Sequence, residues 1–101
     1  MGRSGSLRIR LPREAKERLA EAAKALGLPL RTLIQAVGEE RFRLLWEEAL
    51  RFHGDEVRAM GFLARPNPAL GGRTPLEVAS SDGGLEEVLR VVQNLEEGVF
   101  L

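Results

Sequence analysis

Cysteine is missing from this 101-residue sequence, and histidine occurs only once. Disulfide bonds, thiolate nucleophiles and the usual structural zinc sites all need cysteine, so all three are excluded. A catalytic transition-metal centre commonly relies on several histidines, which a single one cannot supply. We therefore expect no metal and find no reason to expect another cofactor.

Long apolar runs are missing as well. No stretch approaches the roughly 18 consecutive apolar residues of a membrane span, and the first segment, MGRSGSLRIR, lacks the apolar centre of a secretory signal peptide. The cytoplasm is the expected location. With 44% hydrophobic and 30% charged residues, the composition is that of a soluble globular protein, and the length suits one small domain or two interdependent sub-domains.

The net charge is zero, but the charges are unevenly distributed along the chain. Residues 1–37 carry eight basic and three acidic side chains, a balance of +5. Residues 38–101 carry seven arginines and twelve acidic side chains, a balance of −5. This asymmetry suggests two functions, of which the first is contact with a polyanion.

Near the N-terminus, Leu7, Ile9 and Leu11 alternate with Arg8 and Arg10. This period of two is typical of a strand with one buried and one charged face. A single strand leaves its backbone groups unpaired, and no second strand-like run follows in the sequence. The same strand of a second copy is therefore the predicted partner.

Two helices are expected to follow this strand. Pro12 can open a helix, because the missing N–H of a first-turn proline costs no hydrogen bond. Apolar residues recur at helical spacing over residues 13–26, and Gly27 provides a left-handed stop. A second helix is predicted from near Pro29, with Gly38 at its end or as a weak point in a longer helix.

The order of strand, helix, glycine turn and helix resembles the ribbon-helix-helix DNA-binding family over residues 6–45, on the segments LRIRLPRE and ALGLPLRTLI. In that family two chains pair their strands into an antiparallel ribbon that lies in the major groove. The resemblance implies a homodimer through the strand, and a DNA-binding and dimerisation region over residues 1–40. Arginine forks can grip guanine and a helix start can hold a phosphate, so the implied DNA-binding residues are Ser6, Arg8, Arg10, Arg31 and Thr32.

Two other interpretations of the same region stay open. A helix-turn-helix, whose second helix enters the groove, fits the spacing of Ala23, Gly27, Leu28, Thr32 and Leu33. A basic strand can also be a solvated edge that its charges protect from pairing. The alternation of apolar and basic residues favours the ribbon.

Further along the chain, the sequence predicts a third and a fourth helix. The third carries Phe42, Trp46 and Phe52, which we interpret as core residues, and it ends near Gly54. His53, close to that end, is interpreted as a capping or surface residue. A fourth helix is expected between a cap at Asp55 and a stop at Pro66.

The stretch RPNPALGGRTPLE, residues 65–77, contains three prolines and two adjacent glycines. Its last four residues, Thr74 to Glu77, form a capping box with proline at the first helical position, so a short helix begins there. The residues before it are expected to form a rigid turn, because proline restricts the backbone and glycine accepts angles that other residues resist. A final helix is predicted after residues 82–84, closed by Gly98.

The run RPNPALGGRTPLEVASSDGGLEEVLRVVQNLEEGVF is similar to the toxin-binding domain of the Xre/MbcA/ParS class of antitoxins, over about residues 45–100. Members have a compact helical module that binds a toxin of the RES type, an enzyme that degrades NAD or transfers ADP-ribose. Their C-terminal region blocks the toxin's active site, and their N-terminal region usually binds the promoter of the operon. The resemblance implies a type II antitoxin that represses its own promoter, with residues 41–101 as its toxin-binding domain.

Residue types separate contact from support within this module. An exposed arginine beside a helix start and an acidic, apolar C-terminal end suit a cleft built for an anionic dinucleotide. The expected toxin-binding residues are Arg73, Glu96, Glu97, Val99 and Phe100. The residues expected to hold the shape of the module are Pro66, Asn67, Pro68, Gly71, Gly72, Thr74, Pro75 and Gly98.

An enzyme is not expected. The sequence has no serine beside a plausible histidine base, and Gly71 to Thr74 lack the glycine spacing and the lysine of a nucleotide-binding loop. A DNA-binding transcriptional regulator without a toxin partner is the alternative function. The expected fold is mostly α-helical, with a short N-terminal strand that pairs in a dimer and a compact C-terminal helical module.

Overall fold

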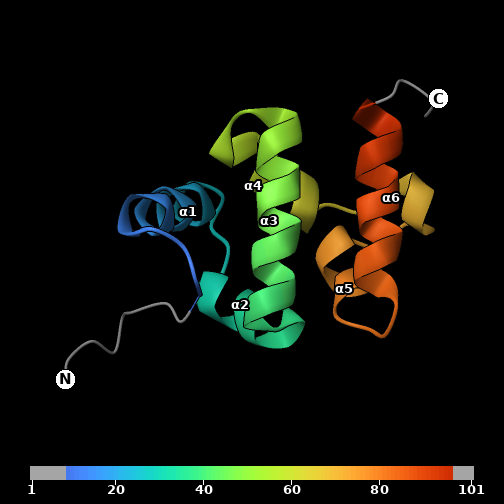
Figure 1. Ribbon diagram of the computed structural model, residues 1–101, viewed down its shortest axis with the longest axis horizontal. Coiled ribbons are helices and arrows are strands. Elements are labelled where there is room, and N and C mark those ends of the chain that lie inside the picture. The colour runs from blue at the N-terminus through green and yellow to red at the C-terminus, as the bar shows by residue number, and fades with distance from the viewer. Residues whose placement is uncertain (1–8, 97–101) are drawn as a thin grey trace.

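The computed structural model describes residues 9–96, which fold into six α-helices and one short 3-10 helix (Figure 1). In chain order these are α1 (Arg13–Ala25), α2 (Leu30–Val37), α3 (Glu39–His53), α4 (Glu56–Ala64), η2 (Pro68–Leu70), α5 (Pro75–Ala79) and α6 (Gly84–Glu96). The mostly helical character matches the expectation. Within residues 9–96, no helix is long and apolar enough to span a membrane.

The predicted N-terminal strand is wrong. Residues 9–96 contain no β-strand, and their only ladder-type pairing is an isolated bridge between Asn67 and Arg73. Ile9 is 3% exposed and packs into the core of its own chain, and the N–H of Leu11 donates to the carbonyl of Ile9 at 3.0 Å. The chain therefore bends at this point instead of extending.

The physical reason for this error is local. Leu11 is half-buried against the same core as Ile9, so the apolar positions of the alternating motif pack within the chain and not on a sheet. The remaining part of that motif, including Leu7 and Arg8, lies outside the described residues. The ribbon-helix-helix interpretation is therefore wrong in its strand, and the described N-terminal region consists of the helices α1 and α2.

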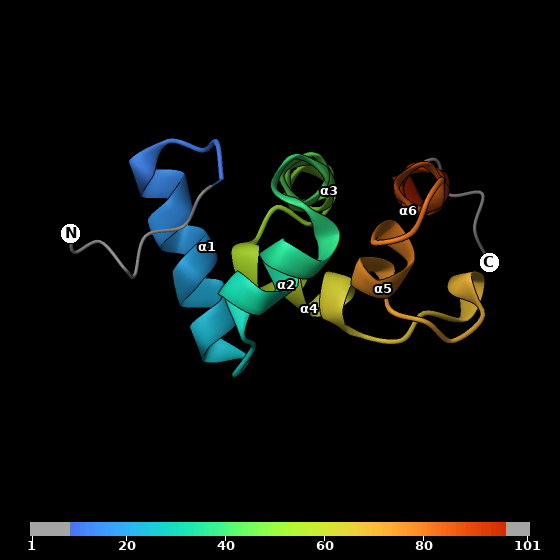
Figure 2. The ribbon, with the colours of Figure 1, turned by 90° about the horizontal axis from the view of Figure 1, so that it is seen from below.

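The helices are arranged around α3, which contacts α2, α4, α5 and α6. Figure 2 shows α3 and α6 end-on in one layer, with α2, α4 and α5 in a second layer and α1 at one side. α1 packs mainly against α4. In Figure 1, α3 and α6 run in the same direction, so their C-terminal ends lie on the same side of the molecule.

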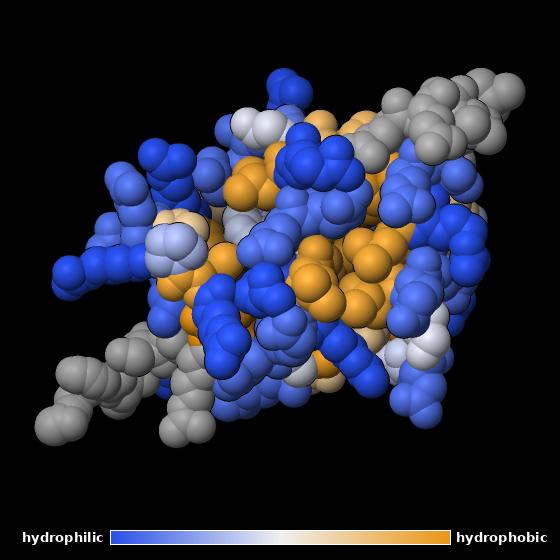
Figure 3. Space-filling model, in the orientation of Figure 1, coloured by the Kyte–Doolittle hydropathy of each residue, from blue (hydrophilic) through white to orange (hydrophobic). Residues whose placement is uncertain are grey.

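One continuous apolar core connects the two layers and extends from Ile9 to Val88 in the sequence. Trp46 and Phe42 are buried at its centre, which confirms their interpretation as core residues, and Phe52 is half-buried. Most of the surface is hydrophilic, although apolar side chains gather between α3 and α6 on the face that Figure 3 shows. On α3, Leu44 is 38% exposed.

Helix boundaries in the second half follow the predicted signals closely. Gly54 ends α3 in the left-handed conformation, with φ at 71°. Asp55 caps α4 by accepting a hydrogen bond from the N–H of Arg58 at 2.9 Å. Both features confirm the sequence prediction. By contrast, α1 and α2 begin after Pro12 and Pro29 without any side-chain cap.

A glycine fixes how closely α6 approaches α5. A Cβ atom added at Gly84 would lie 1.6 Å from the carbonyl oxygen of Val78. No other residue type fits at this position without moving the backbone. The first residue of α6 is thereby held against the end of α5, and the two helices pack together.

Candidate partner-binding site

The turn between α4 and α5 is organised around Asn67. The backbone N–H of Asn67 donates to the carbonyl of Arg73 at 3.0 Å, and its own carbonyl accepts from the N–H groups of Leu70 and Gly72 at 2.9 and 3.0 Å. Its side-chain Oδ1 accepts from the N–H of Ala69 at 2.9 Å. One residue thus takes part in four hydrogen bonds that close the turn.

Two further features hold this turn in place. Gly71 and Gly72 have φ values of 70° and 84°, a region that other residues adopt only with strain. Leu70 is 1% exposed and anchors the turn to the core. With the backbone hydrogen-bonded and one side chain inserted, the turn is a fixed surface and not a loose connection.

The start of α5 completes the fixed segment. Thr74 Oγ1 accepts from the N–H of Glu77 at 3.0 Å, and the Glu77 carboxylate accepts from the N–H of Thr74 at 2.9 Å. This reciprocal pair confirms the predicted capping box. Pro75 at the first position of the helix is buried.

Arg73, an expected toxin contact, joins this turn to α6. Its Nε donates to the carbonyl of Leu70 at 3.0 Å, and one terminal nitrogen lies 3.8 Å from the carboxylate of Glu87. The Arg73 side chain is nevertheless 55% exposed. It is therefore oriented by its own chain while much of its surface stays open to a partner.

A pocket of about 360 Å³ lies where the end of α3, one face of α4 and the start of the turn meet. Its lining residues are His53, Arg58, Phe62, Arg65, Pro66 and Asn67. This pocket was not predicted from the sequence. The available signal was the i, i+4 spacing of Arg58 and Phe62 inside the predicted fourth helix, with Arg65 just before Pro66 at its end.

His53 is not the capping or surface residue that its position suggested. It is half-buried, with its ring centroid 4.8 Å from that of Phe52 and 5.1 Å from that of Phe62. Burial lowers the pKa of His53, and the positive charge of Arg58 acts in the same direction. Its Nε2 atom is buried and has no hydrogen-bond partner within the described part of the chain.

Comparison with known families identifies the segment that contains this turn. Residues 48–98 match the family described as the antitoxin Xre/MbcA/ParS C-terminal toxin-binding domain. The chain belongs to this family. No curated protein and no solved structure matches the chain.

Membership supports an antitoxin role in a toxin-antitoxin pair, with a protein toxin as the partner. The match begins inside α3 and includes α4, the turn, α5 and α6, so we call residues 48–98 the toxin-binding module. It contains every side-chain cap described above, at Asp55, Asn67 and Thr74. Helices α1 and α2 lie outside the match.

The other predicted site residues are placed as follows. Arg31 and Thr32 are exposed in the first turn of α2, and Arg10 is exposed. A hydrogen bond from Arg43 lowers the pKa of the Glu40 carboxyl, and the charge of Arg10 acts in the same direction, which places Arg10 beside α3. Glu96 is the last residue of α6. Outside the described residues lie Ser6, Arg8, Glu97, Gly98, Val99 and Phe100.

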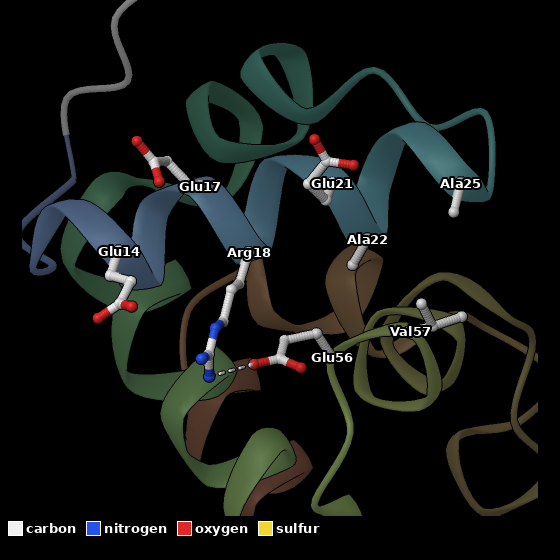
Figure 4. Close-up of a pocket in the computed structure, with 8 residues that line it drawn as sticks. All are labelled: Glu14, Glu17, Arg18, Glu21, Ala22, Ala25, Glu56 and Val57. Carbon is white, nitrogen blue, oxygen red and sulfur yellow. Dashed lines mark ion pairs between the residues drawn. The ribbon is translucent and has the colours of Figure 1, made fainter.

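A second, more open hollow of about 700 Å³ lies along the surface where α1 meets the start of α4 (Figure 4). Glu14, Glu17 and Glu21 of α1 line it, and Arg18 reaches across to the carboxylate of Glu56 at 3.7 Å. Sequence reasoning could not find this hollow, because it depends on the packing of two helices far apart in the chain. Residues 9–96 hold no group of three or more His, Cys, Asp or Glu side chains placed to bind a metal.

Proposed function

We propose that this antitoxin binds and occludes a toxin of the RES type, an enzyme that degrades NAD or transfers ADP-ribose from it. The family match supports the antitoxin role and a toxin partner. The resemblance of RPNPALGGRTPLE and the following residues to antitoxins of RES enzymes supports the toxin class.

The observation that carries this proposal is the fixed turn over residues 65–74. Neutralising an enzyme by occlusion requires a surface that fits its cleft, and no chemistry from the inhibitor. A surface that is ordered before contact loses little conformational entropy on binding, so more of the contact energy appears as affinity. The hydrogen bonds of Asn67 and the buried Leu70 give this turn such order.

Within this proposal, Arg73 and the C-terminal end make the contact. Arg73 is oriented by Leu70 and Glu87 and is more than half exposed, so its guanidinium can engage a carboxylate on the toxin. Glu96 at the end of α6 begins an acidic and apolar segment that continues through Glu97, Val99 and Phe100. We propose that this segment enters the cleft that receives the anionic dinucleotide.

The test is co-expression with the product of the adjacent open reading frame, followed by an assay of NAD consumption. The expected result is a stable complex in which NAD consumption stops when the antitoxin is present in equal amount. Deletion of residues 98–101 is expected to release NAD consumption. A toxin that remains fully active with a saturating excess of the intact chain contradicts the occlusion mechanism.

We also propose that α1 and α2 bind the promoter of the operon in the manner of a helix-turn-helix. Four residues, 26–29, separate the two helices. Arg31 and Thr32 are exposed on the first turn of α2, and both line an open hollow with Lys24 of α1. Exposed polar and basic side chains at the start of a second helix are suited to phosphate and base contacts.

Promoter binding can be separated from toxin neutralisation. The double substitution Arg31→Ala and Thr32→Ala is expected to weaken binding to a promoter fragment in a mobility-shift assay and to leave inhibition of the toxin intact. The substitutions Arg8→Ala and Arg10→Ala are expected to act in the same way. Unchanged promoter affinity in both variants, with the fold preserved, would remove the DNA-binding role. A regulator without a toxin partner, the alternative function, is disfavoured by the family match.

A further inference from the structure

The pocket at the end of α3 has two guanidinium groups in its lining. Arg58 and Arg65 contribute guanidinium groups, and Asn67 contributes its side-chain amide, whose oxygen already accepts from the N–H of Ala69. No carboxylate lines the pocket. With two guanidinium groups and no carboxylate, the charges on the lining favour an anion, and the remaining polar lining residue is His53.

Both arginines lack a charged partner in the described part of the chain. Elsewhere in the toxin-binding module, Arg51 pairs with Glu48, and Arg73 with Glu87. Arg58 and Arg65 form no ion pair with any side chain of residues 9–94, although Asp55 accepts a hydrogen bond from the backbone N–H of Arg58. Arg90 of α6 also forms no ion pair with the described residues, but only Arg58 and Arg65 line a common pocket.

The fold holds these side chains over one face of α4. Arg58 and Phe62 are four residues apart on α4 and so share one face of that helix, and Arg65 follows as the C-cap residue with extended backbone. The guanidinium of Arg65 lies over Gly61 of α4. A Cβ atom added at Gly61 would be 3.6 Å from a terminal nitrogen of Arg65. Phe62 and Pro66 supply apolar walls between the charges.

We propose that this pocket receives an acidic side chain, aspartate or glutamate, from the surface of the toxin. The proposal rests on the toxin partnership of the proposed function and names a contact within it. A guanidinium fork binds a carboxylate through two parallel hydrogen bonds, and the apolar walls suit the aliphatic stem of such a side chain. Burial of two unpaired arginines in an interface is unfavourable unless the partner supplies an acid.

The charge of the module disfavours nucleic acid as the occupant. Residues 48–98 contain nine acidic residues and five arginines, a net charge of −4. An extended polyanion would be repelled by this surface, whereas one carboxylate can reach the pocket without meeting the other acids. The C-terminal ends of α3 and α6 also lie on the same side of the molecule, so the pocket and the end of α6 can face one protein (Figure 1).

The test measures the affinity of the purified toxin for full-length variants by calorimetry or biolayer interferometry. Arg58→Ala with Arg65→Ala is expected to weaken binding about 30-fold or more, because each change removes one member of a desolvated charge pair. Arg58→Lys with Arg65→Lys keeps the charge but loses the fork, so an intermediate loss is expected. Arg90→Ala is the matched control, since Arg90 is an exposed arginine of α6 outside the pocket, and it is expected to stay within about threefold of the intact chain.

Thermal unfolding of each variant separates a lost contact from a lost fold. A double variant that unfolds like the intact chain and still binds toxin as well as Arg90→Ala overturns the proposal. Inorganic phosphate, AMP and a promoter fragment are titrated into the same variants. Arginine-dependent binding of one of these with unchanged toxin affinity assigns the pocket to that ligand and also overturns the proposal. If the intact chain does not bind toxin, the proposed toxin partnership is wrong. If the intact chain binds toxin and the double variant binds it equally well, the partnership holds and only the proposed role of the pocket is wrong.

Discussion

The two ends of this molecule are held in different ways. In the toxin-binding module, Asp55, Asn67 and Thr74 each cap a helix or turn with a side-chain oxygen, and the turn over residues 65–74 closes on itself. Helices α1 and α2 begin after prolines and have no side-chain cap. In the second region the turn between the helices closes through backbone hydrogen bonds such as that from the N–H of Leu28 to the carbonyl of Ala23 at 2.8 Å, and no side chain adds to them. Side-chain capping coincides with the part of the chain that matches a partner-binding family.

The largest expected difference between the regions concerns buried leucine in the turn. Leu70→Ala should lower the free energy of unfolding by about 3 kcal/mol, because it removes the side chain that anchors residues 65–74 to the core. Leu26→Ala, at the end of α1, is the matched change and should cost less than about 1 kcal/mol, since Leu26 is 38% exposed. Urea unfolding of both variants measures the contrast. Equal losses would mean that the turn is no better anchored than the end of α1.

Adjacent glycines at the start of α6 provide the next contrast. Gly84→Ala should destabilise the fold by about 2–3 kcal/mol, because the new Cβ would overlap the carbonyl oxygen of Val78. Gly83→Ala should cost only about 1 kcal/mol, the conformational penalty of a φ of 75° in open space. Thermal unfolding followed by circular dichroism distinguishes the two. A Gly84 variant as stable as the Gly83 variant would show that α5 and α6 do not approach as closely as described.

A smaller effect tests the capping box directly. Thr74→Ala should destabilise by about 1 kcal/mol through loss of the acceptor for the N–H of Glu77. Thr32→Ala is the control, because Thr32 is exposed in the first turn of α2 and caps nothing. Alanine is the better helix former, so stability should stay equal or rise by about 0.3 kcal/mol. Chemical unfolding at one pH compares them. Equal free energies of unfolding for the two variants would show that the Thr74 cap does not stabilise the fold.

The smallest effect is a pH dependence that comes from His53. Burial, assisted by the charge of Arg58, lowers its pKa from the ordinary value of 6.5, so the unfolded chain binds this proton more readily than the folded one. Stability should therefore fall as the pH drops below about 6.5 towards the lowered pKa, and this part should vanish in His53→Leu. The difference in unfolding free energy between the two proteins, measured from pH 7.5 to 5, isolates the histidine from the carboxylates that both share. A constant difference across that range would contradict the burial of His53.

The same contrast explains what the sequence could predict. Caps, glycine stops and the capping box depend on residues that are close together in the sequence. The end of α3 and the starts of α4 and α5 could therefore be predicted from Gly54, Asp55 and Thr74. The strand over residues 7–11 was wrong because alternation over five residues does not say which core the apolar positions enter, and Ile9 enters that of its own chain. The pocket at Arg58 and Arg65 was missed because it needs the end of α3 and the turn to meet, and Arg65 enters it from the extended residue that ends α4.

Amide hydrogen exchange in the free and the toxin-bound chain tests most directly whether the module is shaped before it meets its partner. The account predicts slow exchange at Asn67, Leu70 and Gly72 in the free protein, because their N–H groups donate the hydrogen bonds that close the turn. Toxin should then add protection at the surface of the turn without creating its order. Fast exchange at these three amides in the free chain, with protection gained only in the complex, would contradict the account.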